Sequence, residues 1–116
     1  MTEFITKDSG ERQYYASGMN RDLQEGKPDF SLMFPDMPYD KQPLTRFASL
    51  MTRGAEKYGR RNWQLANSEE EVERFKASAF RHFVQWFCNE EDEDHMAAVM
   101  FNLVACEHTK YQMEEK

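Results

Sequence analysis

The sequence has no long hydrophobic run and few cysteines. No apolar stretch approaches the roughly 18–20 residues that a membrane-spanning helix requires, and residues 1–12 lack the apolar core of a signal peptide. The two cysteines, Cys88 and Cys106, fall inside apolar helical patterns, which predicts buried, reduced thiols. We therefore expect a cytoplasmic protein that does not contact membranes.

Positive charge is also scarce. The chain has 15 Lys and Arg against 21 Asp and Glu, and its formal net charge is −6. Because nucleic-acid binders cluster Lys and Arg on one face, we expect no general nucleic-acid binding. The 116 residues fit one domain, and 40% hydrophobic with 31% charged residues is typical of a globular chain. A small anionic ligand would need help from a metal ion.

Several catalytic signatures are absent. The sequence contains no Ser-His-Asp order, no Cys-His nucleophile arrangement, no CxxC zinc pattern and no GxGxxG fingerprint. These absences argue against covalent catalysis of those kinds and against a dinucleotide-binding fold.

Proline and glycine are concentrated near the N-terminus. All four prolines and three of the five glycines lie within residues 1–43, which show no sustained helical or strand period. This composition predicts an extended arm. Within it, Phe30, Leu32 and Phe34 alternate with polar or smaller positions, which predicts a short extended segment lying on the core.

Helical periodicity begins after Pro43. Apolar residues recur at i, i+3, i+4 and i+7 from 44 to 58, and Gly59 should end this first helix. A second helix opens with Ser68 and Glu71 in a capping-box arrangement and runs to about Cys88. Its predicted core-facing stripe consists of Val72, Phe75, Ala79, Phe83 and Trp86.

A third helix of about 15–20 residues, built on the apolar residues between Met96 and Cys106, is predicted after the acidic stretch 89–94, whose charges complement the positive end of that helix. The sequence thus predicts an all-α fold, a small bundle of three main helices with an extended N-terminal arm. Because the shared core is small, we expect oligomerisation to complete it.

Histidines and acids converge at the junction of the second and third helices. A short loop between antiparallel helices would bring Arg81 and His82 near the segment Asp92–His95. Oxygen ligands with an imidazole suit Mg²⁺ or Mn²⁺, which can neutralise triphosphate charge and orient an attacking water. The alternative is a solvated acidic turn that only caps a helix, with His82 as a hydrogen-bonded histidine at the edge of the core.

A second polar pair lies further along the third helix. His95 and Asn102 are seven residues apart and share one helix face, with Ala98 between them. They contact a ligand, or they are hydrogen-bonded groups inside the bundle.

The segment 54–63, G-A-E-K-Y-G-R-R-N-W, carries groups that serve a nucleotide. Its cations can pair with phosphate oxygens, Glu56 can ligate a metal, and Tyr58 or Trp63 can stack on a base. The alternative is a basic helix end that complements the helix dipole, with Trp63 as a core anchor.

Four segments together resemble a known family: G-K-P-D-F-S-L (26–32), R-G-A-E-K-Y-G-R-R-N-W (53–63), S-A-F-R-H-F-V-Q-W (78–86) and D-E-D-H-M-A-A-V-M-F-N (92–102). Over about residues 18–108 the chain resembles the phage and bacterial dATP/dGTP diphosphohydrolase N-terminal domain family, related to MazG-like all-α nucleoside triphosphate pyrophosphohydrolases. MazG-type enzymes usually carry E-x-x-E and E-x-x-D metal motifs. Here His82 and His95 stand where such acids are expected.

The resemblance implies a divalent-metal hydrolase, and it suggests roles for particular residues. The metal ligands it implies are Glu56, His82, Asp94 and His95. The substrate contacts it implies are Lys57, Arg60, Asn62, Trp63, Arg81 and Asn102. A carboxylate, Glu91 or Asp92, would activate the water.

The function predicted from the sequence is Mg²⁺- or Mn²⁺-dependent hydrolysis of a purine (deoxy)nucleoside triphosphate to monophosphate and pyrophosphate. The protein would be a phage nucleotide-pool enzyme in the host cytoplasm, a homodimer or homotetramer. The alternative is a non-enzymatic phage helical protein that binds a host protein or sequesters a nucleotide. The predicted organisation is a flexible segment 1–17, a helical domain 18–112 and a tail 113–116.

Overall fold

The computed structural model describes residues 3–115 and divides into two compact units, which meet between Leu32 and Met33 in the sequence. The predicted segments 1–17 and 113–116 include residues 1, 2 and 116, which lie outside the described residues. Within residues 3–115, no helix combines the length and the apolar character needed to cross a bilayer.

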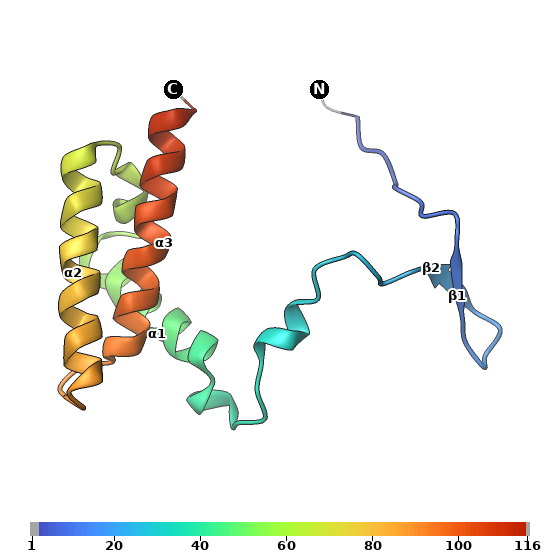
Figure 1. Ribbon diagram of the computed structural model, residues 1–116, viewed down its shortest axis with the longest axis horizontal. Coiled ribbons are helices and arrows are strands. Elements are labelled where there is room, and N and C mark those ends of the chain that lie inside the picture. The colour runs from blue at the N-terminus through green and yellow to red at the C-terminus, as the bar shows by residue number, and fades with distance from the viewer. Residues whose placement is uncertain (1–2, 116) are drawn as a thin grey trace. The chain divides into compact units, whose positions relative to one another are not determined.

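The first unit is built on a hairpin. Strands β1 (Arg12–Tyr14) and β2 (Asn20–Asp22) pair antiparallel, with Gln13 opposite Arg21 (Figure 1). Gly18 has φ +94° in the connecting turn, a conformation that suits glycine because it lacks a Cβ. The sequence analysis predicted no strand here, since three residues are too few to show a strand period.

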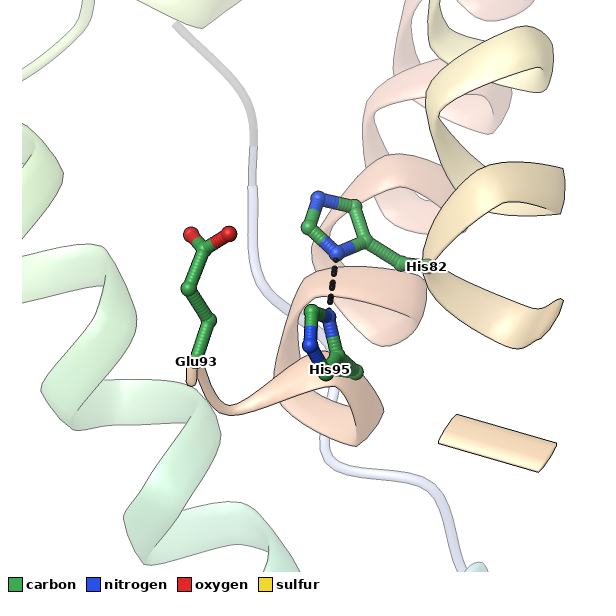
Figure 2. Close-up of side chains that lie close together, drawn as sticks. All are labelled: His82, Glu93 and His95. Carbon is green, nitrogen blue, oxygen red and sulfur yellow. Dashed lines mark hydrogen bonds between the residues drawn. The ribbon is translucent and has the colours of Figure 1, made fainter. Parts of the chain in front are cut away.

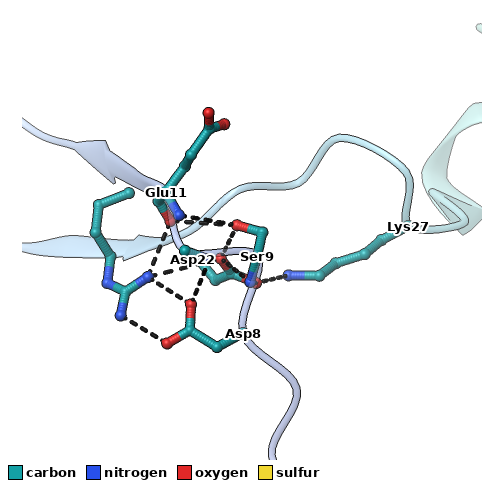
Figure 3. Close-up of polar contacts among 7 residues, drawn as sticks. Asp8, Ser9, Glu11, Asp22 and Lys27 are labelled. Atoms are coloured by element: carbon teal, nitrogen blue, oxygen red, sulfur yellow. Dashed lines mark hydrogen bonds and ion pairs between the residues drawn. The ribbon is translucent and has the colours of Figure 1, made fainter.

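Polar contacts hold this hairpin together, as Figure 3 shows. The carboxylate of Asp22 accepts hydrogen bonds from the backbone N and the hydroxyl of Ser9, and it pairs with Lys27 Nζ at 3.1 Å. These contacts, the Ser9 hydroxyl first, hold the pKa of Asp22 well below its usual range. Arg12 donates two hydrogen bonds to Asp8, and these lower the pKa of Asp8 to about 2. The hairpin therefore depends on ionised carboxylates.

The segment around Phe30 differs from the prediction. Residues Phe30–Met33 form a 3-10 helix, η1, and the extended segment lying on the core that was predicted over Phe30–Phe34 is wrong. The physical reason is local: the Asp29 carboxylate accepts from Ser31 N at 3.0 Å and from the Ser31 hydroxyl, which turns the chain. The side chains of Phe30, Leu32 and Phe34 are exposed.

The second unit contains the three predicted helices. In chain order its elements are η2 (Tyr39–Lys41), α1 (Pro43–Tyr58), η3 (Asn62–Leu65), α2 (Glu69–Phe87) and α3 (His95–Glu114). Helix α3 packs against both α1 and α2, and α2 and α3 run antiparallel side by side (Figure 1). The all-α prediction is confirmed, and α3, with 20 residues, is as long as the sequence predicted.

The helix ends follow the sequence signals. Pro43 occupies the first turn of α1, and Gly59, with φ +97°, ends it. At the start of α2, Glu71 N donates to Ser68 Oγ, and Glu71 Oε1 accepts from Asn67 N at 2.9 Å. The predicted cap of α2 is therefore present, and it fixes where this helix begins.

The core between the helices is made of small side chains. Its buried hydrophobic residues are Ala66, Val72, Ala79, Ala97, Ala98, Ala105 and Cys106. Alanines let the helix backbones approach closely, but they bury little apolar area. The largest fully buried side chains among the described residues are only Val72 and Thr109.

Three sequence predictions about burial are wrong. Cys88 is exposed, whereas Cys106 is buried as predicted. Phe83 and Trp86, predicted to face the core, are each 49% exposed, and His82 is buried in their place. Val72 and Ala79 of the predicted stripe are buried, so the prediction fails only for the members of the stripe near the C-terminal end of α2. Its C-terminal aromatic face is thus left open.

We predict that Asp22→Asn loosens the hairpin, because an amide loses the charge that holds Lys27 and accepts more weakly from Ser9. Backbone amide exchange of Ser9 and of β1 and β2 should become faster, measured by NMR. Glu11→Gln is the matched control, since the Glu11 carboxylate points away from these contacts (Figure 3). Equal exchange rates in the Asp22 variant and the wild type would contradict the assignment.

Candidate functional site

Two buried histidines face each other at the junction of α2 and α3. His82 lies near the C-terminal end of α2 and His95 is the first residue of α3. Their Nδ1 atoms are 2.9 Å apart, as Figure 2 shows, and the two residues are 7% and 2% exposed. His95 Nε2 lies 2.7 Å from the Asp92 carboxylate. The three side chains form one hydrogen-bonded chain.

The neighbours of this chain determine where its protons lie. Arg81 Nη2, which can only donate, is 3.4 Å from His82 Nε2, and the ionised carboxylate of Asp92 can only accept. With both imidazoles neutral, a single assignment satisfies every contact: His82 donates from Nδ1 to His95 Nδ1, and His95 donates from Nε2 to Asp92. Burial, and then the charge of Arg81, lower the pKa of His82, which agrees with a neutral ring.

Glu93 completes a set of groups that can hold a metal ion. Ligand atoms of His82, Glu93 and His95 all lie within 4.8 Å of one another. Figure 2 shows the Glu93 side chain extending from the turn, with its carboxylate level with the His82 ring in this view. A second set of the same kind joins His95 to Glu90 and Asp92. In the assignment above, His82 Nδ1 carries a proton and His95 Nδ1 accepts it, so a divalent ion held by both rings through these atoms would replace this hydrogen bond and displace that proton. Imidazole nitrogens and carboxylate oxygens are donor types that suit a divalent ion.

Asp94 has a different role in the structure. Its carboxylate binds the Arg46 guanidinium through two hydrogen bonds, of 2.9 Å and 2.7 Å, and it accepts from Ala97 N at 3.2 Å. The hydrogen bond from Arg46 is the main cause that lowers the pKa of Asp94. Asp94 therefore caps α3 and ties α1 to the turn that carries the histidine pair.

An open groove of about 530 Å³ lies beside the histidines. Residues of α1 line one part of it, and residues of α2, α3 and the preceding turn line the rest: Leu50, Arg53, Gly54, Lys57, His82, Asp92, Glu93, Asp94 and Ala98. The cations Arg53 and Lys57 thus border the same groove as the possible metal ligands. This arrangement suits a phosphate chain that contacts cations and a metal ion together.

A smaller, mainly apolar pocket of about 290 Å³ lies along α1. Its lining residues are Met51, Gly54, Ala55, Tyr58, Gly59, Arg60, Asn62, Trp63, Phe75 and Phe101. Trp63 packs edge-on against Phe101, with ring centroids 5.9 Å apart, and also against His108. Trp63 is therefore both a packing residue and a wall of the pocket.

The remaining predicted site residues are spread over several places. Glu56 borders a separate shallow groove with Arg60, and within residues 3–115 it joins no group of possible metal ligands. Glu91 is exposed in a shallow groove that also borders His95. Asn102 is buried, and its Nδ2 donates to the Ala98 carbonyl at 2.8 Å, so it acts within its own helix.

Three contributors to the site were not assigned from the sequence. Glu93 belonged to the predicted group of His82 and the segment Asp92–His95, but it was not among the four residues named as metal ligands. Arg46 could not be found from local patterns, because 48 residues separate it from Asp94. Arg53 looks like any exposed cation of an amphipathic helix until the groove is seen.

Comparisons with known proteins give one match. The profile of the family described as "dATP/dGTP diphosphohydrolase, N-terminal" matches residues 17–116. No curated protein and no solved structure matches the chain.

We predict that Asp94→Ala lowers the free energy of unfolding by about 1–2 kcal/mol, because it removes a helix cap and the partner of Arg46. Asp94→Asn keeps the capping oxygen and should lose less. Urea denaturation followed by circular dichroism measures both. Glu91→Ala, in the same turn, removes the same charge from an exposed position and should change stability by less than about 0.5 kcal/mol. Equal losses for Asp94→Ala and Glu91→Ala would refute this role.

Proposed function

Because the chain belongs to the dATP/dGTP diphosphohydrolase, N-terminal family, we propose that it hydrolyses a purine (deoxy)nucleoside triphosphate to the monophosphate and pyrophosphate, using a divalent metal ion. The observation that carries this proposal is the buried His82–His95 pair, with Asp92 and Glu93, beside a groove that also holds Arg53 and Lys57. Such a groove offers metal ligands and phosphate-binding cations together.

We assign the metal ligands to His82, Glu93 and His95. A divalent ion held by them would neutralise triphosphate charge and orient the attacking water. Two imidazoles favour Mn²⁺ over Mg²⁺, because Mg²⁺ prefers oxygen ligands. Asp94 is a positioning residue in this proposal, since its contact with Arg46 holds the start of α3, where His95 lies.

The reaction needs one proton acceptor and one leaving group. The water oxygen forms a bond to the α-phosphorus, and the bond between the α-phosphorus and the bridging oxygen breaks, so pyrophosphate leaves with the electron pair. We assign the water's proton to Asp92, with Glu91 of the same turn as the alternative acceptor. His95 hydrogen-bonds Asp92 Oδ1, which leaves Oδ2 for the water.

Substrate binding is assigned to both cavities along α1. Lys57 and Arg53 lie where they can contact the phosphate chain, and Arg81 lies beside His82 on the exposed surface. Arg60, Asn62 and Trp63 border the neighbouring apolar pocket. Substrate contacts are therefore expected mainly from the second half of α1 and the turn after it.

We predict that His82→Ala and Glu93→Gln each reduce turnover by more than roughly 100-fold. Loss of a residue that only hydrogen-bonds a metal ligand typically costs about 10–100-fold, and loss of a ligand itself should cost more. The assay incubates the protein with dATP or dGTP and Mn²⁺ or Mg²⁺ and separates the products by chromatography. EDTA should abolish product formation. The helicity of Glu93→Gln, measured by circular dichroism, should stay near that of the wild type because Glu93 is exposed, so this variant separates loss of a ligand from loss of the fold.

Glu70→Gln is the matched control for Glu93→Gln. Glu70 is an exposed carboxylate in the first turn of α2, 12 positions before His82 and so about 18 Å away along the helix. Wild-type turnover in the Glu93 variant, or equal loss in the Glu70 variant, would sink the assigned ligand set. No turnover of any nucleotide by the wild type would sink the enzymatic proposal itself.

We also propose that a second copy of the chain covers the aromatic face of α2. Phe80 is 72% and Phe87 71% exposed, and Phe83, Val84 and Trp86 are about half exposed. Since an aromatic side chain can bury roughly 150–250 Å², this face offers on the order of 500 Å², against about 800 Å² per partner in a standard interface. The core of a single chain consists of small residues and does not bury this apolar area, so the area is available to a second copy.

We predict that the wild type is dimeric and that Phe80→Glu with Phe87→Glu makes it monomeric, measured by light scattering after gel filtration. The two positions are seven residues apart and share one helix face. Arg74→Glu, on an exposed position of α2, changes the net charge by the same −2 and should leave the dimer intact. A wild-type monomer would contradict this assignment and favour a different protein as the partner of the face.

A further inference from the structure

The apolar pocket and the metal-binding groove share one residue. Gly54 is the only residue that lines both cavities, which are described above by their full sets of lining residues. On α1, Met51, Ala55 and Tyr58 border the pocket, whereas Arg53 and Lys57 border the groove. Gly54 lies between these two faces of the helix. A ligand that occupied both cavities would pass over it.

The pocket has the chemistry of a nucleobase site. The aromatic side chains of Tyr58, Trp63, Phe75 and Phe101 line it. The rings of Trp63 and Phe75 each meet that of Phe101 edge-on, at 5.9 Å and 6.1 Å, and these contacts hold three of the four walls in place. Fixed aromatic walls suit a flat base. The pocket also contains polar residues that can hydrogen-bond to the edge of a base.

Arg60 and Asn62 supply the polar groups of this pocket. A guanidinium can donate two hydrogen bonds to O6 and N7 of guanine, and a carboxamide can pair with N6 and N7 of adenine. Both patterns read the N7 edge, which only purines have. The pocket therefore suits a purine base.

The packing within the chain does not require glycine at position 54. A Cβ added to Gly54 would meet no atom within 4 Å, and the residue does not have a positive φ. Glycine inside a helix nevertheless destabilises it relative to alanine. Gly54 thus destabilises α1, although no contact within the chain requires it. Its position on the wall between the two cavities explains it, if the missing side chain keeps a passage open.

We propose that the apolar pocket binds the purine base of the substrate and that Gly54 is the crossing point where the nucleotide passes to the metal-binding groove. This inference rests on the proposed function and adds the base site and the residue that links it to the phosphates. It makes Gly54 a specificity-determining position, because only a ligand that spans both cavities needs the crossing.

The test replaces Gly54 with Ala and with Leu. Both variants should have a higher midpoint of thermal unfolding than the wild type, because the helix gains a better helix former. The KM for dATP or dGTP should nevertheless rise, at least 10-fold for Gly54→Leu and less for Gly54→Ala. Ser49→Ala is the matched control: it also favours the helix, and Ser49 is exposed and lines neither cavity. An unchanged KM in Gly54→Leu would overturn the proposal.

A second experiment measures binding of the nucleoside and of the triphosphate separately. It distinguishes failure of the base site from failure of the proposed function. Deoxyguanosine or deoxyadenosine, without metal, should shift the NMR signals of Gly59, Asn62 and the Trp63 indole in both the wild type and Gly54→Leu. Inorganic tripolyphosphate with Mg²⁺ should instead shift Lys57 and Glu93 in both proteins. Only the complete nucleotide should bind Gly54→Leu more weakly than the wild type.

The outcomes point in different directions. If nucleotides are hydrolysed but the deoxynucleosides shift no residue of the pocket, the base site is wrong and the proposed function stands. If the deoxynucleosides bind in the pocket but no nucleotide is hydrolysed, the base site stands and the proposed function is wrong.

Discussion

The hydrogen bond between the two buried imidazoles, His82 and His95, is the contact on which the arrangement of the second unit depends. A polar group buried without a partner costs free energy, so the rings must face each other, and Asp92 must accept the hydrogen bond that His95 donates from Nε2. The pairing of the rings turns His82 toward α3, whereas Phe80 and Phe87 lie on the opposite, exposed side of α2. The candidate metal ligand and the exposed aromatic side chains therefore lie on different faces of one helix.

The position of α1 follows from a second charged contact. The two hydrogen bonds between Arg46 and Asp94 join α1 to the start of α3, where His95 lies. Because this contact holds the start of α1 against the start of α3, the cationic side of α1 borders the acidic turn. Another side of α1 lines the apolar pocket. One helix therefore presents a polar cavity and an apolar cavity, which is the division found in a nucleotide between its phosphates and its base.

Local signals in the sequence were enough for the helices and for part of the site. Caps such as Ser68 and Gly59 mark helix ends, and the short loop between α2 and α3 places His82 near His95 although 13 residues separate them. The exposure of Phe83 and Trp86 could not be predicted, because α2 carries apolar residues on more than one face and the sequence does not show that His82 is hydrogen-bonded inside. Nor could Arg46 be found, since its partner is distant in the chain. The hairpin strands are too short to leave a period.

The central claim, that a divalent ion binds between His82, Glu93 and His95, can be tested most directly by paramagnetic relaxation. Substoichiometric Mn²⁺ would be added to ¹⁵N-labelled protein, and the loss of each amide signal would be measured by NMR, with EDTA to reverse it. The account predicts that broadening centres on these three residues and reaches Gly54 across the groove, while the first turn of α2 keeps its signals. Broadening centred on residues 69–71, or no reversible broadening at any residue, would contradict it.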